Sequence, residues 1–449
     1  MIKSKYSLLV LCLLALQVFI AGCSKDEQVN IASSFEVPAT SDIVMYEVNI
    51  RAFSASHDFD GVTEKMDHIH SLGVNTIWLM PIYPVGQLNS VGQLGSPYAV
   101  ADYTAVNPEF GTMQDFKELI AAAHENGIAV IVDWVANHTA WDNPWIENTD
   151  WYTQDEFGNI ISPAGTNWND VADLNFDNDE MRLTMIDALS FWVDEGVDGF
   201  RCDAADFVPY SFWKQAIDSL TKRHEQPLIL LAEGARADHF NAGFAMNYSW
   251  NFYGTLNNVM NNNGSVVSLF NTHESETGSL LPGTQKLRFT TNHDETAWDE
   301  SPPDLFGGQD AVFAAFVFTT TIGGVPLIYG SQEVGTDFNV PIFSQSEINW
   351  QANPDILEKY AELLNIYKEQ DALRYGSLTW HETGYHVAAY SRKYEQDEIL
   401  VLVNPRDVSL SANLPEDIQG SWISLLNGNS TVLEATISLD PHEYILLKK

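Results

Sequence analysis

Four polar clusters in this sequence each follow an apolar, strand-like run of residues. The clusters are Asp133 with Asn137 and His138, Arg201 with Asp203, Glu233, and Asn292 with His293 and Asp294. Carboxyl groups and imidazoles are the side chains that enzymes most often use as acids, bases and nucleophiles. If the chain folds so that these clusters meet, they would suit hydrolysis or group transfer.

The spacing of the clusters indicates the fold that would bring them together. Asp203 and Glu233 are 30 positions apart, and Glu233 and His293 are 60 positions apart. A (β/α)8 barrel spends roughly 31 residues on each strand–helix unit and carries its catalytic residues at the carboxyl ends of the strands. The intervals therefore predict barrel strands four, five and seven. The 70 positions from Asp133 to Asp203 predict an insertion of about 40 residues after strand three.

Hydrophobic patterns and helix start signals predict the elements that position these clusters. Asp60, and Thr112 with Asp115, are typical helix caps. The predicted strands are 75–80, 128–132, 197–200, 228–231, 287–291 and 325–329, and the predicted helices are 62–72, 112–124, 179–195, 211–224, 310–322 and 354–370. From residue 377, apolar positions alternate between turns, which favours an antiparallel β-sandwich. We therefore expect a barrel domain at 42–376, with its insertion at 138–178, and a sandwich domain at 377–449.

These motifs resemble those of the α-amylase family, glycoside hydrolase family 13. The segments that carry the resemblance are DWVANH (133–138), GFRCD (199–203), Glu233, FTTNHD (289–294), YEVNIRAFS (46–54), SPYAVADYTAVNPEFGT (96–112) and VADLN (171–175). The resemblance covers roughly residues 42–449. It implies an α/β TIM-barrel fold and hydrolysis of α-1,4-glucosidic bonds, with retention, in starch, glycogen or malto-oligosaccharides.

The resemblance implies a role for each carboxylate. Asp203 would be the nucleophile, Glu233 the acid/base, and Asp294 the carboxylate that binds sugar hydroxyls. Retaining enzymes need two carboxyl groups about 5–5.5 Å apart. Arg201 shares a strand face with Asp203 and should favour its charged form. The apolar run at 228–232 should desolvate Glu233 and raise its pKa, as a proton donor requires.

The resemblance also implies residues that bind substrate or metal. Tyr98 would stack on a sugar ring, and His138 and His293 would hydrogen-bond sugar hydroxyls as neutral imidazoles. Asn137 and Asp173 match positions that bind a structural Ca²⁺ in many members, although Asn137 could equally hydrogen-bond loop backbone without a metal. No organic cofactor is expected.

Two departures from the family pattern affect the side of the pocket that holds the leaving group. Many members carry Lys-His where this chain has Asp206-Phe207, and Val-Trp where it has Gly234-Ala235. A glucanotransferase or branching activity therefore stays an alternative, because transfer differs from hydrolysis only in the acceptor. An inactive starch-binding protein is a further alternative, which the presence of all three carboxylates disfavours.

The first 40 residues predict export and anchoring. Lys3 and Lys5 precede an apolar stretch at 8–20 that is too short to span a bilayer. The stretch ends in a box that resembles a bacterial lipoprotein cleavage site, with Cys23 as the lipidated residue. We expect a signal peptide at 1–22 and a tether at 23–41. The mature protein would be an exported lipoprotein on the outer membrane or cell surface of a Gram-negative bacterium, where it would associate with a glucan uptake system. An ordinary signal peptide is the alternative.

Charge and cysteine content limit the partners. The net charge of −39 argues against nucleic acid, which needs a basic face. A neutral α-glucan is not repelled by this charge. Cys202 is the one cysteine beyond the signal region, and strand alternation next to Arg201 and Asp203 places it in the apolar layer between barrel and helices.

Overall fold

The computed structural model describes residues 35–278 and 280–449. Glu36–Lys449 form one compact unit. The predicted signal peptide, Cys23 and most of the predicted tether lie outside the described residues. Within the described ranges, no helix is both long enough and apolar enough to cross a bilayer.

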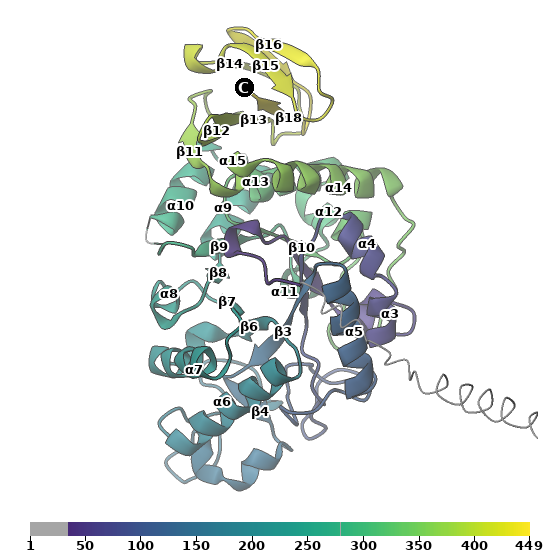
Figure 1. Ribbon diagram of the computed structural model, residues 1–449, viewed down its shortest axis with the longest axis vertical. Helices are drawn as coiled ribbons and strands as arrows, with labels where there is room; N and C mark the ends of the chain where they lie inside the picture. Colours follow the sequence, from purple (N-terminus) through teal and green to yellow (C-terminus); the bar gives the residue numbers. More distant parts are fainter. Residues whose placement is uncertain (1–34, 279) are drawn as a thin grey trace, which may run out of the picture. The chain divides into compact units, whose positions relative to one another are not determined.

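Eight parallel strands close into a barrel in the order β1-β10-β9-β8-β7-β6-β3-β2 (Figure 1). They are β1 (Met45–Val48), β2 (Thr76–Leu79), β3 (Ala129–Val135), β6 (Gly199–Asp203), β7 (Ile229–Ala232), β8 (Met246–Tyr248), β9 (Gln285–Arg288) and β10 (Val325–Tyr329). The predicted barrel is confirmed, and β6, β7 and β9 are its fourth, fifth and seventh strands. Their residues are almost all buried, which fits the apolar runs seen in the sequence.

Helices follow the strands and cover the barrel. They are α2 (Ile50–Phe53), α3 (Phe59–Thr63), α4 (Met66–Ser71), α5 (Met113–Glu125), α6 (Asp179–Asp194), α7 (Tyr210–Arg223), α8 (Asp238–Ala242), α9 (Trp250–Asn261), α10 (Val267–Thr277), α11 (His293–Trp298), α12 (Pro302–Phe306), α13 (Gln309–Thr321), α14 (Pro354–Glu369) and α15 (Asp371–Tyr375). Helix α5 begins with the predicted capping box, in which Thr112 and Asp115 each accept a hydrogen bond from the other's backbone N–H.

Two element predictions are wrong in detail. The helix predicted at 62–72 is two short helices, because the backbone leaves the helical conformation at Lys65 (φ −96°, ψ 3°). Asp58 rather than Asp60 caps the first of them, by accepting from the N–H of Gly61. Strand β9 ends at Arg288, before the predicted 291, and the chain then leads to α11.

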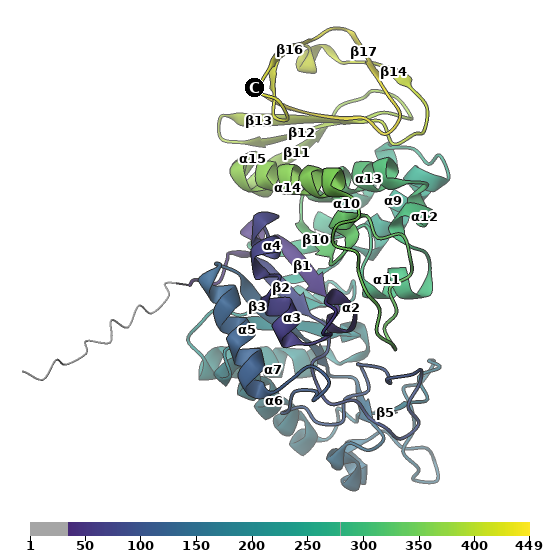
Figure 2. The same ribbon diagram turned by 90° about the vertical axis from the view of Figure 1, so that its right-hand side faces the viewer.

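The C-terminal segment is built from antiparallel strands, as expected, and the insertion also contains an antiparallel pair of strands. In the insertion, β4 (His138–Ala140) pairs with β5 (Val171–Asp173). The C-terminal segment has a six-stranded sheet in the order β11-β12-β13-β18-β15-β16 and a two-stranded sheet β14-β17. These strands are β11 (Ser377–Trp380), β12 (Ala388–Tyr394), β13 (Asp397–Val403), β14 (Leu410–Asn413), β15 (Gly420–Ser424), β16 (Ser430–Leu433), β17 (Thr436–Leu439) and β18 (Tyr444–Lys448). Helix α15 packs on β12 and β13 (Figure 2). The domain boundaries stay a prediction.

One glycine is required where β6 meets β7. A Cβ atom at Gly199 would lie 1.9 Å from the carbonyl oxygen of Ile229, so no other residue lets the two strands approach this closely. Cys202, further along β6, is buried in the apolar layer as predicted. The register of β6 against its neighbours then brings Arg201 and Asp203 to the end of the barrel where β3 also ends.

Candidate active site

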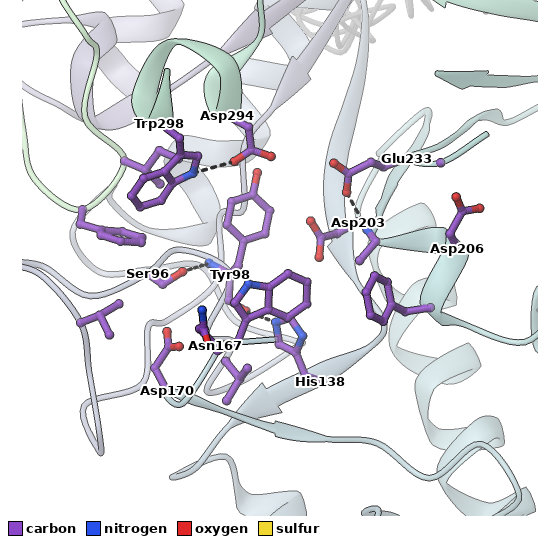
Figure 3. Close-up of a pocket in the computed structure, with 18 of the residues that line it drawn as sticks. Ser96, Tyr98, His138, Asn167, Asp170, Asp203, Asp206, Glu233, Asp294 and Trp298 are labelled. Atoms are coloured by element: carbon purple, nitrogen blue, oxygen red, sulfur yellow. Dashed lines mark hydrogen bonds between the residues drawn. The ribbon is translucent and has the colours of Figure 1, made fainter. Parts of the chain in front are cut away.

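A pocket of about 570 Å³ opens at the carboxyl ends of the barrel strands, within the 300–1,000 Å³ range usual for small-molecule sites. Figure 3 shows Asp294 and Trp298 on one side of it, Asp203, Glu233 and Asp206 on the other, and Tyr98 between them. The pocket is lined by Val91, Ser96, Tyr98, His138, Asn167, Trp168, Asp170, Val171, Asp203, Ala204, Asp206, Phe207, Glu233, Gly234, Trp250, Asp294, Trp298, Ile342 and Phe343. The structure therefore brings together all three predicted carboxylates, with Tyr98 and His138.

Arg201 joins three carboxyl groups beneath this pocket. Its Nη1 donates to Asp133 Oδ1 at 2.8 Å and to Asp203 Oδ1 at 2.9 Å, and its Nη2 lies 2.9 Å from Glu233 Oε1. The Nη2 contact is an ion pair whose angle falls short of a hydrogen bond. Because the nitrogens of one guanidinium are rigidly spaced, Asp203 and Glu233 are held side by side.

Arg201 is one cation that faces three buried or partly buried carboxyl groups. Burial raises the pKa of Asp203 well above its usual range; Arg201 opposes this, and Glu233 and Asp133 add to it. Burial also raises the pKa of Asp133 to about 6, against the opposing charges of Arg201 and His293. Arg201 therefore favours the charged form of Asp203, as predicted, but burial and the neighbouring carboxyl groups outweigh it.

The residue after Asp203 orients Glu233. Ala204 has a left-handed backbone (φ 43°, ψ 41°), which is unfavourable for a residue with a Cβ atom. This conformation directs the Ala204 N–H to Glu233 Oε2 at 2.7 Å. Glu233 thus has one oxygen on the backbone of the β6 loop and the other beside Arg201. Its side chain is only 17% exposed, which agrees with the expected desolvation.

His293 and Asp294 lie in the first turn of α11, which Asn292 caps by accepting from the N–H groups of Asp294 and Glu295. Trp298, one turn further, donates from Nε1 to Asp294 Oδ1 at 3.2 Å. His293 does not line the pocket surface but lies directly beneath it, where its Nε2 is 2.6 Å from the Tyr98 hydroxyl. Tyr98 therefore presents its ring to the pocket while its hydroxyl contacts the buried His293 beneath it.

The two histidines differ in charge. His138 Nε2 contacts the carbonyl oxygen of Tyr98 at 3.2 Å, and burial lowers the pKa of His138 to about 4, so it is the neutral imidazole that was predicted. Burial alone would also lower the pKa of His293, but Asp294 and Glu47 raise it to about 9. The prediction of a neutral His293 is therefore wrong, because two acidic side chains flank it.

The residues predicted to bind Ca²⁺ fit the ion only in part. In the part of the chain that the structure describes, no three His, Cys, Asp or Glu side chains gather as metal ligands. The amide of Asn137 lies 3.3 Å from His138 Nδ1, and its backbone carbonyl accepts from Leu174. Asp173 is paired with His138 across β4 and β5, and burial raises its pKa. A shell of six to eight oxygens would need further backbone carbonyls or water.

The departures from the family pattern form the wall beside Glu233. Asp206 packs over Gly234, where a Cβ atom would lie 2.4 Å from Asp206 Oδ1. Phe207 is 54% exposed and Trp168 of the insertion is 38% exposed, and their ring centroids are 5.7 Å apart. Two exposed aromatic rings from separate loops thus meet at this wall, which is suited to the apolar face of a sugar.

Three residues of the site had no predicted role. Asp133 belongs to the first polar cluster, and its position at the end of a strand was the available signal. Glu47 lies in the YEVNIRAFS segment and contacts His293 Nδ1 at 2.5 Å. Trp298 lines the pocket and is 62% exposed. The sequence contains no local pattern that distinguishes Trp298 from its other tryptophans.

A barrel with carboxylates converging at the carboxyl ends of its strands is the arrangement of barrel glycosidases. The family model described as "Alpha amylase, catalytic domain" matches residues 33–158 and 165–267, about half of the sequence. The chain therefore belongs to the α-amylase family.

Individual relatives agree with this membership. The chain is 28% identical over 438 residues to the alpha-amylase MalA of Haloarcula japonica. The matched region covers 91% of this chain and 63% of that relative. It is 26% identical to alpha-amylase 3 of Dictyoglomus thermophilum, over 92% of this chain and 94% of that protein. The crystal structure of an alpha-amylase from Lactobacillus plantarum is 26% identical, covers 91% of this chain and 99% of its own, and superposes with a TM-score of 0.83.

Proposed function

We propose that this protein is a retaining glycoside hydrolase that cleaves α-1,4-glucosidic bonds in starch, glycogen or malto-oligosaccharides. The observation that carries the proposal is the position of Asp203 and Glu233 on one guanidinium, with Asp294 across the pocket. Retaining enzymes need these two carboxyl groups close together, about 5–5.5 Å apart, and a shared guanidinium favours so close a pair.

The residues divide the reaction between them. Asp203 attacks the anomeric carbon as the bond to the leaving oxygen breaks, and the proton of Glu233 moves to that oxygen. Glu233 then accepts a proton from water as the water oxygen replaces Asp203. The step requires a proton on Glu233 and an ionised Asp203. Substrate that excludes water from Glu233 would favour that distribution.

The remaining groups bind and orient the sugar. Asp294, held by Trp298, accepts hydrogen bonds from sugar hydroxyls that strengthen as the ring flattens toward the transition state. Tyr98 and Trp298 offer rings to the sugar faces. Together with Trp168, Phe207 and Phe343, they place five aromatic rings beside the carboxylates of the pocket, which suits a neutral carbohydrate better than an anionic substrate.

Product analysis tests this proposal. The protein without residues 1–23 is incubated with soluble starch and with maltoheptaose, while reducing ends and product lengths are followed. New reducing ends with α-configured shorter products are expected. Asp203→Asn should abolish turnover but retain glucan binding, and Asp187→Asn, which changes an exposed residue of α6, is the matched control. Unchanged turnover in Asp203→Asn would contradict the assignment of the nucleophile.

A glucanotransferase is the second candidate, and the Trp168–Phe207 wall is the observation that favours it. An aromatic wall beside Glu233 retains a sugar acceptor that then competes with water for the intermediate. Rearranged chain lengths without new reducing ends would support transfer. Binding with neither change would instead indicate an inactive starch-binding protein.

We also propose that Asn137 and Asp173 contribute to a structural Ca²⁺ site that stabilises the insertion. Both lie at the junction of the barrel and the β4–β5 hairpin, and Asp173 is partly buried. If they bind calcium, dialysis against a chelator should lower the melting temperature, and added Ca²⁺ but not Mg²⁺ should restore it. An unchanged melting temperature would contradict a structural Ca²⁺ site.

For location, we propose lipidation at Cys23, with the enzyme anchored on the outer membrane or cell surface and associated with a glucan uptake system. The support is the sequence of the signal region and the neutral substrate class. Full-length protein expressed in a Gram-negative host should incorporate an alkyne-labelled fatty acid and partition with membranes. Cys23→Ser should lose both properties, and label on the Cys23→Ser protein would contradict this site.

A further inference from the structure

The YEVNIRAFS segment contains a buried carboxylate that the proposed reaction does not use. We propose that Glu47 is a positioning residue of the active site, which holds His293 through Nδ1 and fixes it as a positively charged double donor toward Tyr98 and Asp294. The catalytic meaning of this arrangement rests on the proposed function, whereas the charge on His293 does not.

Glu47 reaches His293 from β1, which is separated from β9 by the single strand β10. In β1 it stands in register with Trp78 of β2 and Tyr329 of β10, and its side chain is wholly buried. Its Oε1 lies 2.5 Å from His293 Nδ1. His293 is itself 1% exposed, so the contact between them is shielded from water, and its energy is not weakened by solvent.

The hydrogen-bond pattern at the other nitrogen indicates where the protons lie. His293 Nε2 is 2.6 Å from the Tyr98 oxygen and 3.5 Å from Asp294 Oδ2. The Tyr98 hydroxyl has one hydrogen, and Asp133 Oδ2, 3.1 Å away, is a second acceptor for it. With that hydrogen on Asp133, the Tyr98 oxygen accepts from His293, and Glu47 as a carboxylate also only accepts. We infer this arrangement, in which both ring nitrogens of His293 carry hydrogen and the ring is an imidazolium.

The charges around His293 favour this state. The ionisable and aromatic groups that face it are Glu47 of β1, Trp78 of β2, Tyr98 of the loop after β2, Asp133 of β3, Arg201 of β6 and Asp294 of its own helix. Burial and Arg201 lower the pKa of His293, but Asp294 and Glu47 outweigh them and raise it to about 9. Glu47 acts both through its charge and through its contact with Nδ1, so its removal should lower the pKa of His293 while the contribution of Asp294 remains.

The buried carboxylate of Glu47 lowers the stability of the folded protein. Its Oε2 is buried and has no hydrogen-bond partner among the residues that the structure describes. A buried, half-satisfied carboxylate is unfavourable, and an apolar residue would fill the same space without that cost. A positive charge on His293 compensates the buried carboxylate, and its Nε2–H holds the hydroxyl of Tyr98, whose ring forms part of the pocket wall.

The pH profile of kcat/KM tests the proposal. With α-maltosyl fluoride, whose leaving group needs no proton, the alkaline limb no longer reports Glu233 and should reflect His293 near pH 9. In Glu47→Gln, the limb should move by at least one pH unit toward acid. The ratio of kcat/KM at pH 8.5 to that at pH 6.5 should then fall by at least about threefold. Glu47→Asp keeps the charge and should restore part of the alkaline activity.

Glu333→Gln is the matched control. Glu333 is also wholly buried and contacts a histidine, with Oε1 2.9 Å from His68 Nε2, but it does not line the pocket. This variant should lose stability without moving the alkaline limb. Equal profiles for Glu47→Gln and the wild type, or an equal shift in Glu333→Gln, would overturn the proposal.

A direct measurement separates this proposal from the proposed function and from failure to fold. Histidines labelled with ¹³C are titrated in the wild-type protein, and the His293 signal is assigned by its loss in His293→Asn. The signal should stay that of an imidazolium up to about pH 8. A neutral His293 at pH 7 would overturn the proposal even if Glu47→Gln does not fold. Absence of activity on every glucan, with a charged His293, would refute only the proposed function.

Discussion

Replacing Arg201 by Met should remove the one cation that Asp133, Asp203 and Glu233 share. Met fills part of the same space but carries no charge. Arg201 is wholly buried and also stacks on Trp78, with the guanidinium 4.8 Å from the ring centroid. Removing one partner of a buried ion pair costs about 3–5 kcal/mol, because the other charge is left unpaired. We expect a loss of that size at pH 8.

The loss should depend on pH in a defined direction. Burial already raises the pKa of Asp133 to about 6, above its unfolded value, so the folded state binds more protons in that range. The corresponding stability is fully present below about pH 4 and is lost as the pH rises through about 6. Without Arg201 the folded carboxyl groups have still higher pKa values. The destabilisation relative to wild type should therefore be smaller at pH 5 than at pH 8, by up to about 1.4 kcal/mol for each further pKa unit.

Urea unfolding at pH 5 and pH 8, followed by tryptophan fluorescence, measures both quantities. Arg288→Met is the control, because Arg288 is equally buried but pairs with one carboxylate, Glu276, at 2.6 Å and lies outside the pocket. It should be destabilised with a weaker pH dependence. A loss in Arg201→Met below about 1 kcal/mol, or the same loss at both pH values, would refute the reasoning.

Three further predictions concern the surroundings of the pocket. Arg51 is buried and donates to Glu109 and to backbone carbonyls of the loops near residues 95 and 342. Arg51→Met should lower the free energy of unfolding in urea by about 3–5 kcal/mol and raise KM. An unchanged KM would show that these loops do not need Arg51. Burial raises the pKa of the Cys202 thiol, so a thiol reagent should label it only in denaturant; rapid labelling of the native protein would contradict its burial. Trp168→Ala or Phe207→Ala should raise KM for maltoheptaose several-fold, which corresponds to a loss of about 1 kcal/mol of binding free energy. KM values equal to that of the wild type would show that the two rings do not contact the substrate.

The barrel could be predicted because its signals are local. Each strand is a short apolar run, and polar residues follow where the strand leaves the core, so the intervals between runs count strand–helix units. The capping box at Thr112 and Asp115 is likewise complete within four residues. Where competing local signals exist, prediction failed, as for Asp58 and Asp60 at the start of α3.

The sequence by itself determined the fold, the strands that end at or shortly before Asp203, Glu233 and Asp294, and the end of the barrel at which these residues meet. Only the tertiary structure decided how charge is distributed among them. Arg201 faces three carboxyl groups rather than one, and His293 is paired with Glu47, 246 positions away in the chain. Both facts follow from barrel closure, which sets β1 beside β10 and aims side chains of distant strands at one buried point. A pKa depends on burial and on charges within a few ångströms, and spacing along a chain specifies neither.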